Sequence, residues 1–455
     1  MAVTDDRRAD PSRDSAHSPA RDVPFAIRDP LRIPRERYYD RNFFELENEY
    51  LWPRVWQMAC RLEEIPRPGD FVEYEICDQS VLIVRQPDLS IRAFHNACRH
   101  RATQLCTGSG RLLGGQIVCP FHGWRWNLDG SNSFVYGADG FAPETLRPED
   151  LRLRECRVDT WGACVWINMD EHARPLREAL SPGAEILETV GVENLRVWWW
   201  KETILDANWK VAQEAFHEGY HVMATHPQLS FGMGEDYPVG TVDYTALANG
   251  HARFQGKFDP AAGGVSEGRG AEAFLARSRL LWEGQDAMTL ERDLHVFEGL
   301  RKLVPPGEDF PTAAIKALFD YAAGAGIPLR PTPEGIRLWG GEVFLFPNFM
   351  VLPLYGNALS YRVRPYGNDP EKCRFEVWSL TMYPEGAEPG RATLKGRFAP
   401  DDTENWGLIP RQDFGNIGRQ QRGLHSRGFR EHRLAARWEP AIGNMHAELD
   451  RYLAG

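Results

Sequence analysis

The sequence has no uncharged apolar run that approaches the ~18 residues of a membrane span. Its first 25 residues, which include Asp5, Asp6, Arg7 and Arg8, also lack the apolar core of a signal peptide. We therefore expect a cytoplasmic protein that does not bind membranes, with a disordered tail over residues 1–25.

Cysteine is scarce, with eight residues in a chain of 455. This density is too low for the disulfide framework of a small secreted domain, so reduced thiols are expected. Long runs of lysine or arginine are absent as well, and the net charge of −11 makes nucleic acid an unexpected partner. The sequence also lacks a fingerprint for binding flavin or nicotinamide.

The length of the chain and the change in residue pattern along it predict two domains. Residues 26–52 have the apolar spacing of a helical segment that packs on the second domain, and one amphipathic helix is expected over 37–56. Short β-rich runs between turns predict a small β domain over 53–165. Mixed strands and helices predict an α+β domain over 166–455, in which 231–333 is read as an insertion that shapes a pocket.

Four potential metal ligands occur as two mixed pairs, Cys98 with His100 and Cys119 with His122. A two-iron cluster could take both thiolates on one iron and both imidazoles on the other, which is the Rieske arrangement. Zinc accepts the same ligand types, but zinc fingers usually pair cysteine with cysteine and histidine with histidine. The mixed pairs therefore favour a [2Fe-2S] cluster, and Cys106 between them is expected to be a packed thiol.

His221 and His226 stand five positions apart, near the end of a helix predicted over 209–224 with Asn208 as its N-cap. Five residues turn an ideal helix by ~500°, so the two rings would not share a face. Pro227 disfavours the helical conformation at His226 and would let the chain break there. Two imidazoles and one carboxylate form the facial triad of non-haem Fe(II) oxygenases, so a third ligand is expected from elsewhere in the chain.

Both motifs, together with the run Cys-Pro-Phe-His-Gly-Trp from Cys119, resemble the alpha subunits of Rieske oxygenases. This group contains aromatic-ring dioxygenases, aromatic hydroxylases and oxidative demethylases, and the similarity extends from about Phe43 onward. It implies an α+β fold with a small antiparallel β Rieske domain and a helix-grip, START-like catalytic domain built on an antiparallel sheet. It also implies a [2Fe-2S] cluster, a mononuclear Fe(II), and a trimer to which some members add a beta subunit.

The resemblance also implies roles for acidic residues. Asp402, in an Asp-Asp pair before a predicted helix over 404–422, matches the place of the third iron ligand, with Asp401 as the alternative. Glu218 matches the carboxylate that links the iron-bound His221 to the cluster ligand His122 of a neighbouring subunit. The family more often has Asp at this bridge, and a Glu is similar to carnitine-type monooxygenases.

As a Rieske alpha subunit, the chain would be a terminal oxygenase that uses O₂ and electrons from a ferredoxin or flavin reductase. Ring dihydroxylation of a small, aromatic substrate is the favoured reaction. The alternatives are a Rieske monooxygenase that hydroxylates or oxidatively demethylates its substrate, including a quaternary amine, and a Rieske electron-transfer protein.

The surroundings of the two sites show departures from the family pattern and give two further expectations. Ala102 stands where the family often has Gly, and Ala215 stands where it often has Asn. Positive charge near the cluster is expected to guide an acidic electron donor; it comes from Arg99, Arg101, Arg111 and Arg125. The walls of the substrate pocket are expected to include Phe216, Met223, Phe231, Trp339, Phe344 and Phe349.

Overall fold

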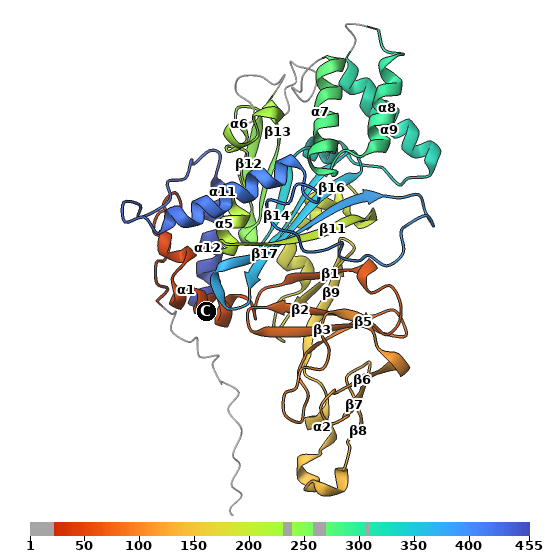
Figure 1. Cartoon of the computed structure of the whole chain (residues 1–455), viewed down its shortest axis with the longest axis vertical. Coiled ribbons are helices and arrows are strands. Elements are labelled where there is room, and N and C mark those ends of the chain that lie inside the picture. The colour runs from red at the N-terminus through yellow and green to blue at the C-terminus, as the bar shows by residue number, and fades with distance from the viewer. Residues whose placement is uncertain (1–21, 231–238, 258–269, 306–308) are drawn as a thin grey trace, which may run out of the picture.

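The computed structural model describes residues 22–230, 239–257, 270–305 and 309–455. They form a small β domain and a larger domain in which helices surround an antiparallel sheet (Figure 1). The expected α+β class is thus confirmed. Residues 1–21 of the expected tail lie outside the described part, whereas Val23 is buried, so the packed chain begins before residue 26.

The small domain contains a seven-stranded antiparallel sheet, ordered β1-β10-β9-β4-β3-β2-β5, and a three-stranded sheet, β6-β7-β8. Alternate residues of β2 are buried, as expected for a strand with one face on the core. The three-stranded sheet lies at the end of the domain farthest from the large domain (Figure 1). The elements are β1 (Gln57–Arg61), β2 (Asp70–Ile76), β3 (Gln79–Arg85), β4 (Ile91–His95), β5 (Ser109–Arg111), β6 (Gln116–Val118), β7 (Arg125–Asn127), β8 (Asn132–Phe134), α2 (Pro148–Leu151), β9 (Glu155–Trp161) and β10 (Cys164–Asn168).

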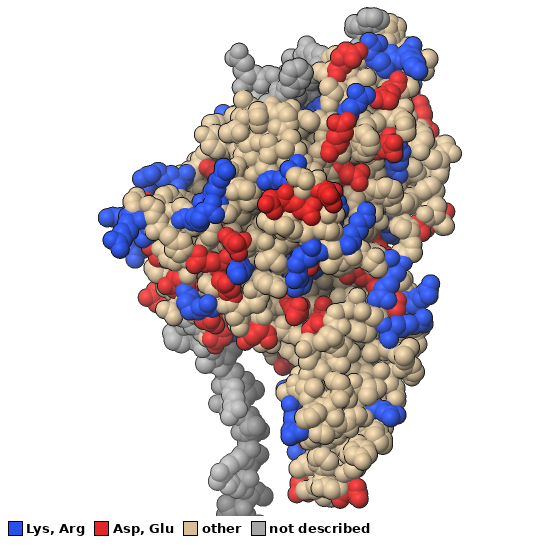
Figure 2. All heavy atoms as spheres, in the orientation of Figure 1, with Lys and Arg blue, Asp and Glu red and all other residues tan. Residues whose placement is uncertain are grey.

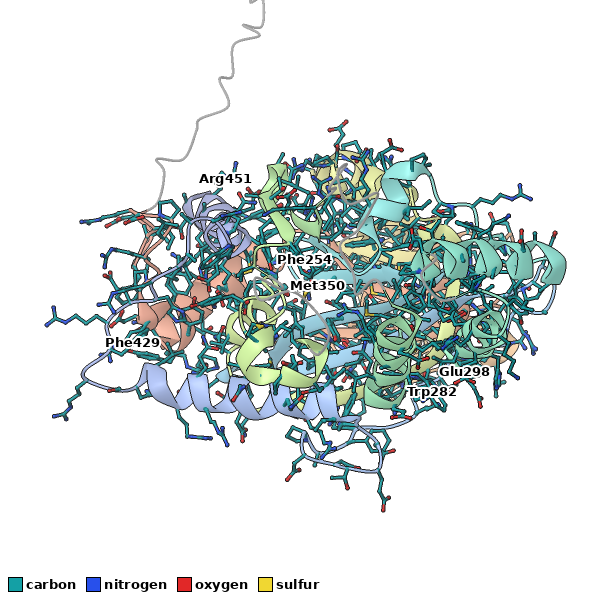
Figure 3. All side chains as sticks on the ribbon, turned by 90° about the horizontal axis from the view of Figure 1, so that it is seen from above. Phe254, Trp282, Glu298, Met350, Phe429 and Arg451 are labelled. Atoms are coloured by element: carbon teal, nitrogen blue, oxygen red, sulfur yellow. The ribbon has the colours of Figure 1, made fainter. Side chains whose placement is uncertain are left out.

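The large domain is built on a seven-stranded antiparallel sheet ordered β11-β17-β16-β15-β14-β13-β12. Its strands are β11 (Leu195–Leu205), β12 (Val242–Ala246), β13 (Ala252–Gly256), β14 (Glu342–Leu345), β15 (Phe349–Leu354), β16 (Asn357–Tyr366) and β17 (Asp369–Met382). The central strands β14 to β16 are buried along nearly their whole length, because helices cover the sheet. Seen from above, Phe254 and Met350 lie near the centre of the molecule, with helices around them (Figure 3).

The helices of the large domain form separate groups around this sheet. They are α3 (Leu176–Leu180), α4 (Gly183–Glu188), α5 (Trp209–Glu214), α6 (Val222–Thr225), α7 (Ala271–Gln285), α8 (Glu291–Arg301), α9 (Phe310–Ala325), α10 (Pro333–Leu338), α11 (Leu408–Leu424) and α12 (Pro440–Ala454). α5 packs on β16 and β17, and α11 packs on both α5 and α7. Among the described residues, none of the helices is long and apolar enough to cross a membrane.

Three expected elements differ from the structure. The helix expected over 37–56 begins later, because Asp40 adopts an extended backbone and caps α1 (Arg41–Leu46) by accepting a hydrogen bond from Phe43 N. Helical structure then continues through Glu47–Leu51. The helix over 209–224 begins at the expected cap, where Asn208 accepts a hydrogen bond from Lys210 N, but ends at Glu214. The region 231–333 is only partly an insertion, since it contains β12 and β13 of the central sheet.

The N-terminal helical segment is fastened to the large domain by buried polar contacts. Lys210 of α5 forms an ion pair with Glu47, and both side chains are fully buried. Tyr38 donates to Glu214 at 3.0 Å. Because removing one partner would leave the other charge unpaired in the interior, these contacts hold the segment in one position.

A buried arginine joins the two domains. Arg362 of β16 pairs with Glu376 of β17 at 2.6 Å and also donates to the carbonyl oxygen of Met58 in β1 at 2.9 Å. The sheet of the large domain is therefore bonded directly to an edge strand of the small domain.

Candidate metal centres and substrate pocket

The loops that carry the two Cys/His pairs have the same pattern of backbone hydrogen bonds. In the first loop Cys98 N donates to Thr103 O and Ala102 N donates to Cys98 O. In the second loop Cys119 N donates to Trp124 O and Gly123 N donates to Cys119 O. Each loop closes through a residue with positive φ, +60° at Ala102 and +69° at Gly123. The family's usual glycine at position 102 therefore has a physical reason, since this conformation is strained for other residues.

The four side chains of these pairs come together at the end of the small domain. The Cys98 and Cys119 thiols are buried, 5% and 2% exposed, whereas His100 and His122 are half-buried. The two imidazole rings lie 4.8 Å apart, and Trp124 stacks on His100 at 4.9 Å. This arrangement fits a cluster with its thiolate-bound iron inside and its imidazole-bound iron towards the surface.

His100 supplies a further test of the fit. Its Nδ1 atom is buried and has no hydrogen-bond partner among the described residues. A buried polar atom without a partner is costly, and a metal ion bound to Nδ1 would satisfy it. Cys106 is a half-buried free thiol, and the four ligands of the candidate cluster are supplied without it.

His221 and His226 flank the short helix α6. His226 has φ −124° and ψ 57°, outside the helical region, as predicted from the following Pro227. This break brings the two rings to 5.4 Å, and one nitrogen of each lies within 4.8 Å of a carboxylate oxygen of Asp413. The set of two imidazoles and one carboxylate is the facial triad of non-haem iron enzymes.

The hydrogen bonds around this triad leave one nitrogen of each ring facing the centre. His226 Nδ1 lies 2.8 Å from Gln412 Oε1, an oxygen that also accepts from Gln228, so the ring proton belongs at Nδ1. His226 Nε2 then faces Asp413 Oδ1 at 2.8 Å as a second acceptor. With Nδ1 directed at Gln412, Nε2 of His226 and Oδ1 of Asp413 would be available to hold Fe(II).

Asp402 is not part of this centre, and its assignment as the third ligand is wrong. Its carboxylate instead accepts hydrogen bonds from Glu404 N and Asn405 N, both at 2.9 Å, and so closes a surface turn. The alternative, Asp401, is exposed. The expected helix begins at Leu408 instead of 404, and its buried face presents Asp413 to the histidines.

A sequence signal for Asp413 existed in the pattern of α11. Ile409, Asp413 and Ile417 follow one another at four-residue spacing and are all buried. An acidic residue in the middle of an apolar helical stripe needs a partner, and a metal ion is one.

On the side of the iron triad, Glu218 contacts His221, as the expected bridging role requires. Its Oε1 is 2.7 Å from His221 Nδ1, and its Oε2 accepts from His221 N at 2.9 Å. The carboxylate therefore fixes the orientation of the ring and places the second ring nitrogen toward Asp413, at 3.7 Å. Its contact with His122 of a neighbouring subunit stays a prediction.

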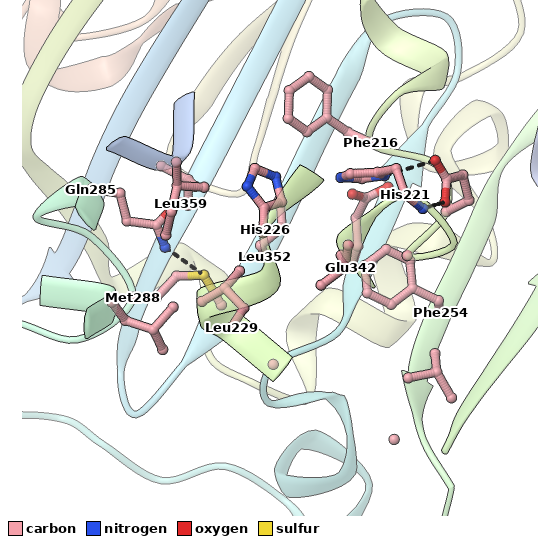
Figure 4. Close-up of a pocket in the computed structure, with 18 of the residues that line it drawn as sticks. Phe216, His221, His226, Leu229, Phe254, Gln285, Met288, Glu342, Leu352 and Leu359 are labelled. Atoms are coloured by element: carbon pink, nitrogen blue, oxygen red, sulfur yellow. Dashed lines mark hydrogen bonds and ion pairs between the residues drawn. The ribbon is translucent and has the colours of Figure 1, made fainter. Parts of the chain in front are cut away.

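A pocket opens beside the triad, between the sheet and helices α7 and α11 (Figure 4). Its volume is about 170 Å³, and its walls include His221, His226 and Asp413. The apolar part comes from Phe216, Val222, Leu229, Phe254, Leu281, Met288, Trp339, Leu352, Leu359 and Ile409. A small organic molecule would thus lie next to the metal.

Of the expected pocket walls, Phe216 and Trp339 line this cavity. Phe344 and Phe349 are instead buried among the strands of the sheet, and Met223 is 46% exposed on the surface. Phe231 lies outside the described residues. A residue that the sequence analysis missed is Glu342, an acidic side chain in the pocket wall.

Comparison with protein families gives two matches, one in each domain. The model of the Rieske [2Fe-2S] domain matches residues 55–135, and the model of the ring hydroxylating alpha subunit (catalytic domain) matches residues 192–455. The first contains all four ligands of the candidate cluster, and the second contains the triad and the pocket. These matches confirm the expected pair of cofactors, a Rieske cluster and a mononuclear iron.

Curated relatives include both dioxygenase and monooxygenase subunits. The 2-aminobenzenesulfonate 2,3-dioxygenase subunit alpha of Alcaligenes sp is 32% identical over 191 residues, which are 40% of this chain and 47% of that protein. The carnitine monooxygenase oxygenase subunit of Escherichia coli is 32% identical over 200 residues, 44% of this chain and 53% of that protein. The chain spans about half the length of the curated relatives it matches.

Solved structures share the fold over almost the whole chain. A quaternary ammonium Rieske monooxygenase has a TM-score of 0.65 and 20% identity, covering 95% of this chain and 99% of that one. Naphthalene 1,2-dioxygenase from Rhodococcus sp. has a TM-score of 0.63 and 18% identity, covering 93% of this chain and 94% of that one. At this level of identity the likeness shows the fold alone.

Proposed function

Because the chain belongs to the family of ring-hydroxylating alpha subunits, we propose that it is the terminal oxygenase of a multicomponent Rieske system. It would use O₂ and electrons from a ferredoxin or flavin reductase to oxidise a small organic molecule. The observation that carries the proposal is the convergence of His221, His226 and Asp413 on the wall of a mostly apolar pocket.

In this proposal Cys98, His100, Cys119 and His122 hold the [2Fe-2S] cluster, and the triad holds Fe(II). The cluster would supply electrons singly, and the iron would activate O₂ at coordination positions that three protein ligands leave open. The protein's own contribution is positional. Glu218 and Gln412 fix the two histidine rings, and the apolar walls hold the substrate and exclude water.

The two centres lie in different domains, and in one chain they are far apart. The cluster loops adjoin β6 and β7 at the end of the small domain, whereas α6 lies in the large domain on the other side of the molecule (Figure 1). We propose that electrons pass between subunits of a homotrimer, from the cluster of one to the iron of the next. His122 of one subunit would contact Glu218 of its neighbour.

Exposed apolar side chains support such an assembly. Around the cluster loops they are Leu113, Val118, Phe121, Phe134 and Tyr136. On the face drawn in Figure 2, most of the surface of this part of the molecule is uncharged. Near Glu218, Tyr220 and Met223 are 54% and 46% exposed. Apolar patches of this kind are typical of surfaces that contact another protein.

Positive charge beside the cluster supports an acidic electron donor. Arg101 lies 3.1 Å from His122 Nε2 and stacks over Phe121. Arg99 and Arg125 are exposed nearby. An acidic ferredoxin would be attracted to this edge of the small domain, and its reduction of the cluster would slow as salt is added.

The number of oxygen atoms inserted distinguishes ring dihydroxylation from the alternative of monooxygenation, which the carnitine and glycine betaine relatives support. The test is a screen of aromatic and amine compounds with ¹⁸O₂, NADH and a surrogate ferredoxin and reductase. Two labelled atoms in the product mean dihydroxylation and one means monooxygenation. No product above the level of an Asp413→Ala variant would contradict the proposal.

We also propose that the protein is cytoplasmic. All eight cysteines lie in the described part of the chain and none of them forms a disulfide there. Free thiols suit a reducing compartment.

A further inference from the structure

One acidic side chain in the pocket has no part in the metal site. Glu342 is the first residue of β14, is 2% exposed and lines the cavity. Its Oε2 atom has no hydrogen-bond partner among the described residues. Figure 4 shows the side chain pointing into the pocket toward His221, with Phe216 and Phe254 on either side. Since an unpaired buried carboxyl costs free energy, its partner is expected to be a molecule in the pocket.

The other charged side chains that line the pocket have partners other than Glu342. Glu218 is engaged with His221, and Asp413 with His226. Among the described lining residues, Arg277 is the one basic residue besides the histidines. It donates a hydrogen bond to the carbonyl oxygen of Leu229 at 3.2 Å.

Aromatic rings surround the same space. They are Phe216, Tyr244, Phe254, Trp339 and Tyr361. The faces of such rings attract cations, most strongly where water is excluded. A buried carboxyl among aromatic rings combines the two features that hold an ammonium group and its apolar substituents.

We propose that Glu342 is the substrate-recognition residue of this pocket and that it selects an organic cation, an ammonium group carried on a small apolar body. This inference deepens the proposed function and rests on it, because it takes the pocket beside the iron triad as the substrate site. A neutral hydrocarbon of the same shape would leave the carboxyl without a partner and bind more weakly.

The test compares cations with neutral molecules of matched shape. Choline is paired with 3,3-dimethylbutan-1-ol, in which carbon replaces the charged nitrogen, and benzylamine is paired with benzyl alcohol. Binding to the metal-loaded protein is measured by calorimetry without O₂ or reductant. We expect at least one of the cations to bind about tenfold or more tightly than its neutral partner.

Substitutions then assign that preference to Glu342. In Glu342→Gln the preference should fall to about threefold or less, while Glu342→Asp, which keeps the charge, should retain part of it. The surface variant Glu283→Gln is the matched control, because Glu283 is exposed on α7, and it should bind as the native protein does. Failure of both cations to bind better than their neutral partners would overturn the inference. A preference that survives in Glu342→Gln would overturn it as well.

The same samples separate this inference from the proposed function. Iron and acid-labile sulfide content and the EPR spectrum are measured on each protein before calorimetry. Proteins that lack the cluster or the mononuclear iron would contradict the proposed function. Proteins that hold both but show no preference for cations would contradict the role of Glu342 alone.

Discussion

The carboxylates of Asp413 and Asp402 lie in contrasting environments. Asp413 is 5% exposed and faces two histidines, whereas Asp402 accepts hydrogen bonds from its own turn. Because Asp413 faces the two ring nitrogens directed at the metal, its removal leaves Fe(II) with two protein ligands.

We predict that Asp413→Ala loses most of its mononuclear iron, with affinity at least about tenfold lower, and retains the cluster. Asp402→Ala is the matched control and should keep both metals. Iron analysis after dialysis checks both variants. Retention of the mononuclear iron in Asp413→Ala, with loss in Asp402→Ala, would return the role to Asp402.

Glu218 contacts His221 at 2.7 Å, and we propose that it acts through this histidine as a positioning residue. We predict that Glu218→Gln keeps both metals, since the amide can still bond His221, but lowers turnover about 100-fold by weakening the link between the centres. Single-turnover kinetics should show slower oxidation of the cluster. Native turnover in this variant, with Glu283→Gln as the control, would be evidence against the bridging role.

At the scale of elements, the motifs formed by neighbouring residues were predictable from the sequence, whereas the third ligand, Asp413, was not. The cluster pairs and His221 with His226 are each set by a few residues of one loop or turn, including the break imposed by Pro227. Asp413 meets His226 across 187 positions of sequence. Such a contact depends on how α11 packs on α5, which local spacing does not determine.

The residues that line the pocket were also only partly predictable from the sequence. The residue pattern predicted mixed strands and helices over 166–455, but not which position along each strand meets the pocket. Glu342 and Phe344 share one face of β14, but only Glu342 lines the pocket; Phe344 was therefore assigned wrongly and Glu342 was overlooked. The available signal was a lone acidic residue at the start of the apolar run Val343–Leu345.

The matching designs of the two cluster loops give a prediction about Ala102. Its φ of +60° costs about 1 kcal/mol in a residue with a Cβ atom, and the equivalent position of the second loop is Gly123. Ala102→Gly should therefore stabilise the first loop by about that amount, and Gly123→Ala should destabilise the second by a similar amount. The temperature at which the cluster absorbance is lost should rise in the first variant and fall in the second. A fall in Ala102→Gly would contradict the strain argument.

At the scale of the whole molecule, the proposed electron transfer between subunits gives a prediction. We predict that a chain without the cluster, Cys98→Ser, and a chain without the mononuclear iron, Asp413→Ala, are each inactive as homomers. Trimers formed by mixing the two should recover part of the activity, because one chain supplies the cluster and its neighbour supplies the iron. Absence of recovery in mixed trimers of verified composition would show that electrons stay within one chain.

A chain that holds a Rieske cluster and a separate mononuclear iron has a characteristic metal content. We would first measure the iron and acid-labile sulfide of the native protein and record an EPR spectrum after reduction by dithionite. We expect about three irons and two sulfides per chain and a Rieske-type signal. Zinc in place of iron, with no such signal, would contradict this expectation.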